Sequence, residues 1–287
     1  MNTETLKMFI LIVQKGSITA AAKELGYAQS NISTKVQHLE EELNTKLFYR
    51  NRRGITLTDS GQELFKQAVK IVSLTEQTIN QIQDPQNVHG KIRIGSLQTS
   101  ASTFLPKVLA TYHDKNPNVE LTIKTGTTLA SENAVLNYEL DGAIIGGEIN
   151  NDNLTTVKLM DEDLCLITPY SKTKDILHDS ILVFPVGCAY RKTLEDWLDS
   201  NKITLHRPIE FDYLNAIVAS VSAGLGISIL PKNVVQPFID AKTVSSIELP
   251  KKFSKLPISF IYRKDYILGK SLKLLITDLK YYYNSEN

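Results

Sequence analysis

Three short amphipathic segments open this chain, and glycines punctuate them. The first spans residues 4–16, and its apolar residues share one helical face: Leu6, Phe9, Ile10 and Val13. Gly16 ends this helix, and Ser17 is a suitable N-cap for an alanine-rich helix over residues 18–25. Gly26 then allows a sharp turn into a third helix that starts near Gln29. Because small alanine side chains let two helices approach closely, the pattern predicts a helix-turn-helix.

The third helix combines a buried stripe with an unusually polar outer face. Its stripe consists of Ile32, Val36, Leu39 and Leu43. Short polar residues face the other way, mostly in the first two turns: Gln29, Ser30, Asn31, Ser33, Thr34 and Gln37. Amides and hydroxyls pair with base edges and phosphates in a DNA major groove. We therefore predict that this helix contacts DNA, with Ser17 and Thr19 as further contacts.

A basic loop between two short apolar runs follows the third helix. The runs, residues 47–48 and 55–57, are too short for helices. Between them lie three arginines and a glycine: Arg50, Arg52, Arg53 and Gly54. Residues 1–58 hold eight Lys and Arg against five Asp and Glu, whereas the rest of the chain holds 24 against 26. The pattern predicts a two-stranded wing whose local positive charge binds phosphates.

These features together resemble the LysR-type transcriptional regulators. The residues that carry the resemblance lie in the three helices, the wing and the helix that follows: Leu6, Phe9, Gly16, Ser17, Thr19, Ala20–Ala22, Leu25, Gln29, Ile32, Ser33, Leu39, Glu40, Leu43, Leu47, Phe48, Arg50, Thr56, Thr58, Gly61 and Leu64. The resemblance continues in residues 184–191 and 221–231 and so covers essentially the whole chain. Many members have proline and a small residue where this chain has Ser30 and Asn31, so no preferred DNA sequence is carried over.

A long helix over residues 59–83 follows the wing. Its apolar and small residues recur every three or four positions: Leu64, Ala68, Ile71, Thr75, Ile79 and Ile82. At ~1.5 Å per residue, this helix is roughly 37 Å long and has to bury its stripe. The stripe either packs on its own domain or forms a coiled-coil-like dimer contact, and we favour the dimer contact. Residues 84–90 then break the helix and form a hinge.

Strands alternate with helices beyond the hinge. Residues 91–95, 119–123 and 142–147 are predicted strands, with helices near Ser102 and over 132–140. Such alternation predicts a parallel sheet that binds ligands beyond the carboxyl ends of its strands. A second unit begins at 163–169, with strands at 180–184, 209–211 and 225–231 and helices at 192–200 and 215–223. A strand at 258–262 closes the sheet, and a terminal helix spans 269–283.

The predicted fold class is therefore α/β, in three parts. An N-terminal winged helix-turn-helix covers residues 1–58, and a linker and dimerisation helix with its hinge covers 59–89. A two-lobed effector domain like that of periplasmic binding proteins covers 90–287. Lobe I takes about 90–160 and 266–287, and lobe II about 161–265.

Polar loops at the predicted strand ends mark a candidate effector site. Hydroxyls and helix-start amides near Thr99 and Ser100 suit a carboxylate, although they could simply cap that helix. Thr99 and Ser100 also match positions that commonly touch ligand in the family that the chain resembles. The candidate pocket residues are Leu97, Gln98, Thr99, Ser100, Thr125, Gly146, Gly147, Gly187, Cys188, Ala189 and Arg191. Arg191 either pairs with an anionic effector or sits in a structural ion pair, and the sequence leaves both readings open.

Composition indicates a soluble globular protein, with 42% hydrophobic and 22% charged residues. We expect a cytoplasmic location and no membrane partner, because the chain has no apolar run of membrane-spanning length and no features of a signal peptide. No cofactor or metal is expected, since the two cysteines and five histidines show no ligand spacing. Cys188 lies in the predicted cleft loop, but Cys165, in a strand core, would be a poor partner for redox sensing.

The leading hypothesis is a homodimeric or homotetrameric transcription factor that binds a pseudo-palindromic duplex and responds to a small-molecule effector. RNA polymerase is a further candidate partner. An architectural DNA-binding repressor without an effector is the first alternative. An enzyme built on the two-lobed domain is the second, and the absence of a catalytic residue arrangement in the cleft loops argues against it.

Overall fold

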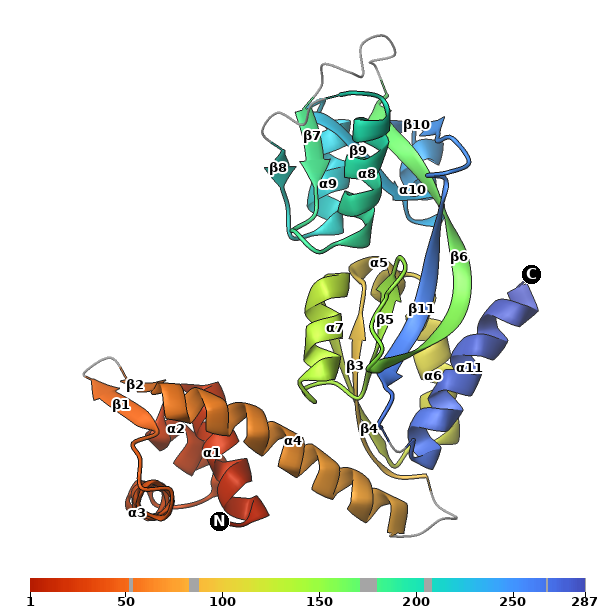
Figure 1. Ribbon diagram of the computed structural model, residues 1–287. Coiled ribbons are helices and arrows are strands. Elements are labelled where there is room, and N and C mark those ends of the chain that lie inside the picture. The colour runs from red at the N-terminus through yellow and green to blue at the C-terminus, as the bar shows by residue number, and fades with distance from the viewer. Residues whose placement is uncertain (52–53, 83–87, 171–179, 204–207, 267, 287) are drawn as a thin grey trace. The chain divides into compact units, whose positions relative to one another are not determined.

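The computed structural model describes the chain apart from residues 52–53, 83–87, 171–179, 204–207, 267 and 287. Its contacts divide into two compact units, shown in Figure 1. The first comprises Met1–Gln86 with Asn137–Glu139, and the second comprises Asn87–Leu136 with Leu140–Asn287. No helix among the described residues is long and apolar enough to span a membrane.

The first unit is a helix-turn-helix with a wing and a long helix. Its elements are α1 (Thr3–Lys15), α2 (Ile18–Leu25), α3 (Gln29–Glu42), β1 (Phe48–Asn51), β2 (Gly54–Leu57) and α4 (Asp59–Ile82). Gly16 and Gly26 end the first two helices in the left-handed conformation, with φ of +61° and +70°. Ser17 Oγ caps α2 by accepting a hydrogen bond from Ala20 N at 3.3 Å. These features agree with the sequence prediction.

The core of this unit forms where the three short helices and the wing meet. Phe9, Ile12, Ile32 and Val36 have no exposed surface. Phe9 packs against Phe48 of the wing, with ring centroids 5.2 Å apart. The hairpin is antiparallel and pairs residues 48–51 with residues 57–54. Leu43, predicted to be buried, is exposed because α3 ends at Glu42 and Leu43 is its C-cap.

The second unit begins with a lobe built on a mixed sheet. In chain order it contains β3 (Gly90–Ser96), α5 (Gln98–Ser102), α6 (Leu105–Lys115), β4 (Val119–Thr125), α7 (Thr128–Leu136) and β5 (Gly142–Gly146). Near the end of the chain, β11 (Lys255–Arg263) and α11 (Lys270–Glu286) complete it. β3 is parallel to both β4 and β5, as predicted, but β11 is antiparallel to β5. The sheet is therefore not purely parallel.

The other lobe contains β6 (Leu154–Pro169), β7 (Ser180–Val183), α8 (Ala189–Ser200), β8 (Ile209–Glu210), α9 (Leu214–Ser222), β9 (Gly226–Pro231), α10 (Lys232–Asp240) and β10 (Val244–Glu248). The main sheet has the strand order β4-β3-β5-β11-β6-β9-β7-β8, and β10 also pairs with β6. The long strands β6 and β11 pass from one lobe to the other (Figure 1). β6 and β11 pair with each other along this crossing, so they connect the two lobes through a double strand.

Several elements differ from the sequence prediction. β6 starts at Leu154, and the acidic triplet 161–163, where a boundary between lobes was predicted, lies inside this continuous strand. α10 was not predicted because Pro237 stands inside it. β10 was not predicted either, since its side chains are mostly exposed and polar. α7 begins four residues before the predicted helix.

Candidate functional site

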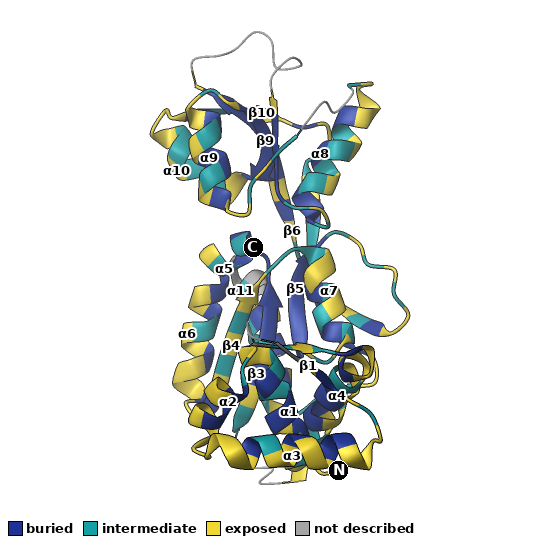
Figure 2. Ribbon diagram, turned by 90° about the vertical axis from the view of Figure 1, so that its left-hand side faces the viewer, coloured by how far each residue is buried: buried dark blue, intermediate teal, exposed yellow. Residues whose placement is uncertain are grey.

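The outer face of α3 forms one candidate site. Gln29, Ser30, Asn31, Thr34 and Gln37 are exposed on it, whereas Ser33 is half-buried. Figure 2 shows this exposed side of α3. The polar groups bond along the helix: Gln29 Nε2 donates to Ser33 Oγ at 3.1 Å, and Gln37 Nε2 donates to Glu41 Oε1 at 2.8 Å. These weak surface bonds can be exchanged for contacts with bases and phosphates.

Glu40 is a buried acid on the same helix that sequence reasoning missed. Its side chain is 5% exposed, and its carboxylate accepts hydrogen bonds from Lys46 Nζ at 2.8 Å and from Leu47 N at 2.9 Å. Burial raises the pKa of Glu40, but these hydrogen bonds outweigh it and leave the pKa lower than usual. Glu40 therefore fixes the start of the wing against α3. Its position four residues after Val36 was the available signal, because that spacing places it on the inner face.

The remaining predicted DNA contacts lie on α2 and the wing. Thr19 is exposed on α2, and Ser17 serves as the cap of that helix. Arg50 lies in β1, paired with Ile55 of β2. Arg52 and Arg53 lie outside the described residues. The contribution of the arginines to DNA binding therefore stays a prediction.

The predicted stripe of α4 is buried near the start of the helix and exposed further along it. Ala68 is fully buried in the core of its own domain, and Leu64 packs against that core. Ile71, Ile79 and Ile82 are 41%, 43% and 75% exposed, while Thr75 is half-buried. The alternative of packing on the same chain therefore holds for Leu64 and Ala68. The exposed isoleucines remain available to a partner.

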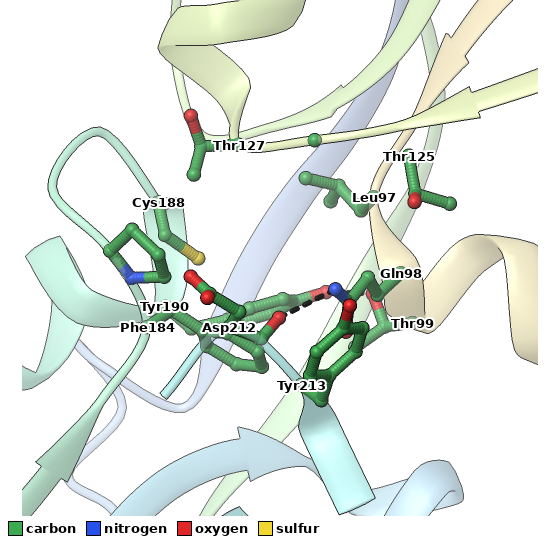
Figure 3. A pocket seen from close by; sticks show the side chains of 12 residues that line it. Leu97, Gln98, Thr99, Thr125, Thr127, Phe184, Cys188, Tyr190, Asp212 and Tyr213 are labelled. Carbon is green, nitrogen blue, oxygen red and sulfur yellow. Dashed lines mark hydrogen bonds between the residues drawn. The ribbon is translucent and has the colours of Figure 1, made fainter. Parts of the chain in front are cut away.

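A cavity of about 310 Å³ lies between the two lobes of the second unit. Figure 3 shows side chains that line it. Its lining consists of Leu97, Gln98, Thr99, Thr125, Gly126, Thr127, Phe184, Pro185, Cys188, Tyr190, Asp212 and Tyr213. Hydroxyls, an amide and a carboxylate stand among apolar and aromatic surfaces, which is the usual make-up of a small-molecule pocket. No lysine or arginine belongs to this lining.

Hydrogen bonds connect the two lobes beside this pocket. Gln98 Nε2 donates to the carbonyl of Asp212 at 2.6 Å, and Gln98 Oε1 accepts from Leu214 N at 3.1 Å, at the start of α9. Elsewhere along the cleft, Leu129 N donates to the carbonyl of Gly187 at 3.2 Å. Gly187 has φ of +88°, and a Cβ there would lie 2.6 Å from Leu129 Cβ. Glycine is therefore required for this close approach.

The predicted pocket residues separate into three groups. Leu97, Gln98, Thr99, Thr125 and Cys188 line the cavity. A second hollow is lined by Gly146, Gly147, Gly187, Ala189 and Arg191, again with Cys188. Ser100 lines neither; it is fully buried, and its Oγ has no hydrogen-bond partner within the described part of the chain. Sequence reasoning did not select Tyr190, Asp212 or Tyr213, whose aromatic and acidic side chains carried no distinctive spacing.

Two of the predicted residues that border the second hollow make close structural contacts. Arg191 forms ion pairs with Glu195 at 2.7 Å and Glu210 at 2.6 Å, the alternative that the sequence left open. Gly146 is packed, since a Cβ there would lie 2.9 Å from Leu256 Cδ2. Close packing therefore explains why this position is a glycine, although Gly146 also borders the second hollow.

The cysteines show no arrangement for redox chemistry in the described chain. Cys165 and Cys188 are free and buried. Burial raises the pKa of the Cys165 thiol to about 11, and it also raises the pKa of Cys188. A high pKa disfavours the reactive thiolate. Among the described residues, no cluster of three or more His, Cys, Asp or Glu could hold a metal ion.

A winged helix-turn-helix joined to a bilobed α/β domain with a pocket between its lobes defines a class of DNA-binding regulators. Two family models match this chain: "Bacterial regulatory helix-turn-helix protein, lysR family" over residues 3–62 and "LysR substrate binding domain" over residues 85–282. The chain therefore belongs to the LysR family of DNA-binding transcriptional regulators. Its relatives are regulators and not enzymes.

Similar proteins support this assignment along the whole chain. The chain is 38% identical to the HTH-type transcriptional regulator YofA of Bacillus velezensis, over 98% of each protein. It is 39% identical to the HTH-type transcriptional regulator GltR of Bacillus subtilis, over 98% of this chain and 96% of GltR. Solved structures share the fold at 21% identity. Full-length CbnR complexed with its target DNA has a TM-score of 0.70 over 98% of this chain and all of CbnR. A full-length OxyR variant from Pseudomonas aeruginosa has a TM-score of 0.75 over 98% of this chain and 95% of OxyR.

Proposed function

We propose that this regulator binds a pseudo-palindromic duplex as a homodimer or homotetramer, in the cytoplasm, and that a small molecule in the cavity between the lobes controls its output. The observation that carries the proposal is the cavity itself. Its walls come from α5 and the end of β4 on one side and from the loops before α8 and α9 on the other. A ligand that touches both walls would favour the closed arrangement by its extra affinity for it.

We infer that α3 and the wing supply the DNA contacts. Gln29, Ser33 and Gln37 are the leading candidates for base or positioning contacts, because their amides and hydroxyls lie on the exposed face of α3. The wing arginines would contact phosphates and carry much of the salt dependence. The resemblance of the fold to a regulator solved with its target DNA supports this arrangement.

We further propose that exposed isoleucines of α4 form the dimer contact. Ile71, Leu74, Ile79 and Ile82 are all exposed apolar residues on this helix. Exposed apolar side chains gathered on one element commonly mark an interaction site. A second copy of α4 could cover these residues in a coiled-coil-like pairing.

The pocket lining changes the expected chemistry of the effector. The sequence indicated an anionic molecule, partly because Arg191 was a candidate cation. Arg191 does not line the cavity and is already paired with two glutamates. The lining contains one carboxylate, Asp212, and no basic side chain. We therefore propose a small polar molecule that carries a hydrogen-bond donor, in place of a purely anionic one.

Replacement of Thr99 by valine should weaken effector binding. Thr99→Val keeps the side-chain volume while deleting the hydroxyl that borders the cavity. A screen of metabolites by thermal shift would first identify an effector, since binding to the native state raises the Tm. Calorimetry should then show about a tenfold higher Kd, the value of one lost hydrogen bond of ~1.4 kcal/mol.

The matched control for this experiment is Thr111→Val, at an exposed position on α6 away from the cavity lining. This variant should bind the effector as the parent does. Unchanged affinity in Thr99→Val would show that the pocket is assigned wrongly. If no metabolite raises the Tm, the architectural alternative without an effector gains support.

A further inference from the structure

A buried chain of hydrogen bonds connects the pocket to a carboxyl group in the strand that joins the lobes. Thr99 Oγ1 and Tyr190 Oη are 2.6 Å apart, and Tyr190 Oη lies 2.7 Å from Glu162 Oε2. Thr99 belongs to α5, Tyr190 to α8 and Glu162 to β6. Each of the three residues is at most 2% exposed. Thr99 and Tyr190 both line the cavity.

The number of protons on Thr99, Tyr190 and Glu162 fixes the direction of the hydrogen bonds between them. An ionised carboxylate can only accept, so Tyr190 must donate its single hydroxyl proton to Glu162. Tyr190 Oη can then only accept from Thr99. The Thr99 proton is used in that bond, and Thr99 Oγ1 has only lone pairs left for a ligand.

Protonation of Glu162 removes this constraint. A neutral carboxyl can donate to Tyr190 Oη as well as accept from it. Tyr190 is then free to donate to Thr99 Oγ1, and the Thr99 proton is free to turn toward the cavity. The same threonine thus acts as an acceptor in one state and as a donor in the other.

We propose that Glu162, acting through Tyr190, sets the hydrogen-bond polarity of the pocket and so selects between donor-bearing and acceptor-only ligands. This inference rests on the proposed function, because it requires that the cavity bind a small molecule. Glu162 is a positioning residue in this scheme, since it does not line the cavity.

The surroundings of Glu162 allow it to change protonation near neutral pH. Burial raises its pKa to about 7, although the hydrogen bond from Tyr190 opposes the rise. Glu162 also lines a third hollow. The nearby charged and titratable groups there are Lys107 of α6, Asp161 and Asp163 of β6, Lys232 of α10 and Tyr282 of α11. Cys188, the residue before α8, adds to the rise in the pKa of Tyr190 through its charge interaction. On β11, the uncharged Leu256 lies opposite Glu162.

None of the cations near Glu162 neutralises it in a direct ion pair within the described chain. Asp161 is paired with Lys158 at 2.8 Å, and Asp163 with Lys255 at 3.7 Å. The third hollow gives Glu162 a route for proton exchange other than the ligand cavity. Proton uptake by Glu162 can therefore accompany ligand binding.

The inference predicts opposite behaviour for two matched probes. Benzoate offers only acceptors and benzamidine only donors at its polar end, their shapes are nearly the same, and both keep their charge from about pH 6 to about pH 8. Benzoate binding would require a protonated Glu162, so its Kd should rise about tenfold for each pH unit above the pKa of Glu162. Benzamidine can bind in either state. The ratio of the two Kd values should therefore rise with pH.

Calorimetry on the full chain tests this, with variants that separate polarity from charge. Glu162→Gln places an amide there that can donate or accept at every pH. The ratio of the two Kd values should therefore stay, at every pH, near the value that the parent shows at low pH. Tyr190→Phe removes the hydroxyl that connects Thr99 to Glu162, and it should also abolish the pH dependence of this ratio. Glu120→Gln, which changes an exposed carboxylate paired with Lys91, is the control and should behave like the parent.

Several outcomes would overturn the inference without touching the proposed function. One such outcome is a ratio of the benzoate and benzamidine Kd values that does not change with pH in the parent. Another is a pH dependence of this ratio that persists in Tyr190→Phe, because the charge of Glu162 alone would then explain it. A ligand-independent measurement decides the case in which neither probe binds. The infrared band of a protonated carboxyl, present in the parent and absent in Glu162→Gln, should disappear as the pH rises through about 7. A Glu162 already ionised at about pH 5 contradicts the inference. Failure of the proposed function would show differently, as the absence of any metabolite that raises the Tm.

Discussion

The variant Ile79→Asp should sediment as a monomer at concentrations where the parent is a dimer. Ile79 is 43% exposed on α4, and it lies near the exposed Ile71 and Ile82. If a second α4 covers this surface, aspartate would place an unpaired charge in an apolar contact, which costs several kcal/mol. Operator affinity should fall by about a hundredfold or more, because two linked half-site contacts become independent ones.

Lys66→Asp provides the matched control for this experiment. Lys66 is exposed on a polar face of the same helix, near Glu63 and Lys70. The control introduces the same aspartate but should leave the sedimentation coefficient of the dimer unchanged. A dimeric Ile79→Asp protein would place the subunit contact elsewhere, and α4 would lose its proposed role.

The second large effect is expected at Glu40. In Glu40→Ala, the buried N–H of Leu47 and the ammonium of Lys46 both lose their carboxylate partner. Leu47 has no exposed surface, so its N–H would be left without a hydrogen bond. We expect a loss of about 2–3 kcal/mol from the free energy of unfolding of the DNA-binding unit. The wing should also lose its fixed position, and DNA affinity should fall with it.

Denaturation followed by circular dichroism, together with a DNA titration, checks this expectation. Glu42→Ala is the control, since Glu42 is an exposed acid of the same helix and should change stability by less than ~1 kcal/mol. Equal stability of the two variants would mean that Glu40 does not anchor the wing.

Local sequence patterns predicted the first unit well. The glycines at 16 and 26, the cap at Ser17 and the stripe from Ile32 to Leu39 all act within a few residues, and the structure confirms each of them. Their effects depend on backbone conformation and helical spacing, which a single sequence displays directly. Leu43 was predicted wrongly because α3 ends at Glu42, and the spacing does not fix where a helix ends. The role of Glu40 was missed because its partner, Leu47 N, lies beyond the helix.

The pocket was harder to predict because its partners come from distant parts of the chain. Thr99 was predicted from its loop, but its partner Tyr190 lies 91 residues further on. Glu162 stands in an acidic triplet typical of a surface loop, and only tertiary contacts place it against Tyr190. Arg191 was a candidate either for an anionic effector or for a structural ion pair, and the helix was predicted to begin after it. In the structure, α8 begins at Ala189, so the neighbouring Tyr190 lines the cavity and Arg191 binds glutamates.

The central claim is that this LysR-family chain recognises a specific duplex through the exposed face of α3. Selection from a random duplex pool with the full chain should enrich a pseudo-palindrome with two half-sites. Fluorescence titrations at one fixed salt concentration should then show clear preference of the parent for that sequence over a scrambled one. In Gln29→Ala this preference should shrink by ~1–3 kcal/mol if Gln29 makes a bidentate base contact. Enrichment of no sequence, or equal affinity of the parent for selected and scrambled duplexes, would contradict the account.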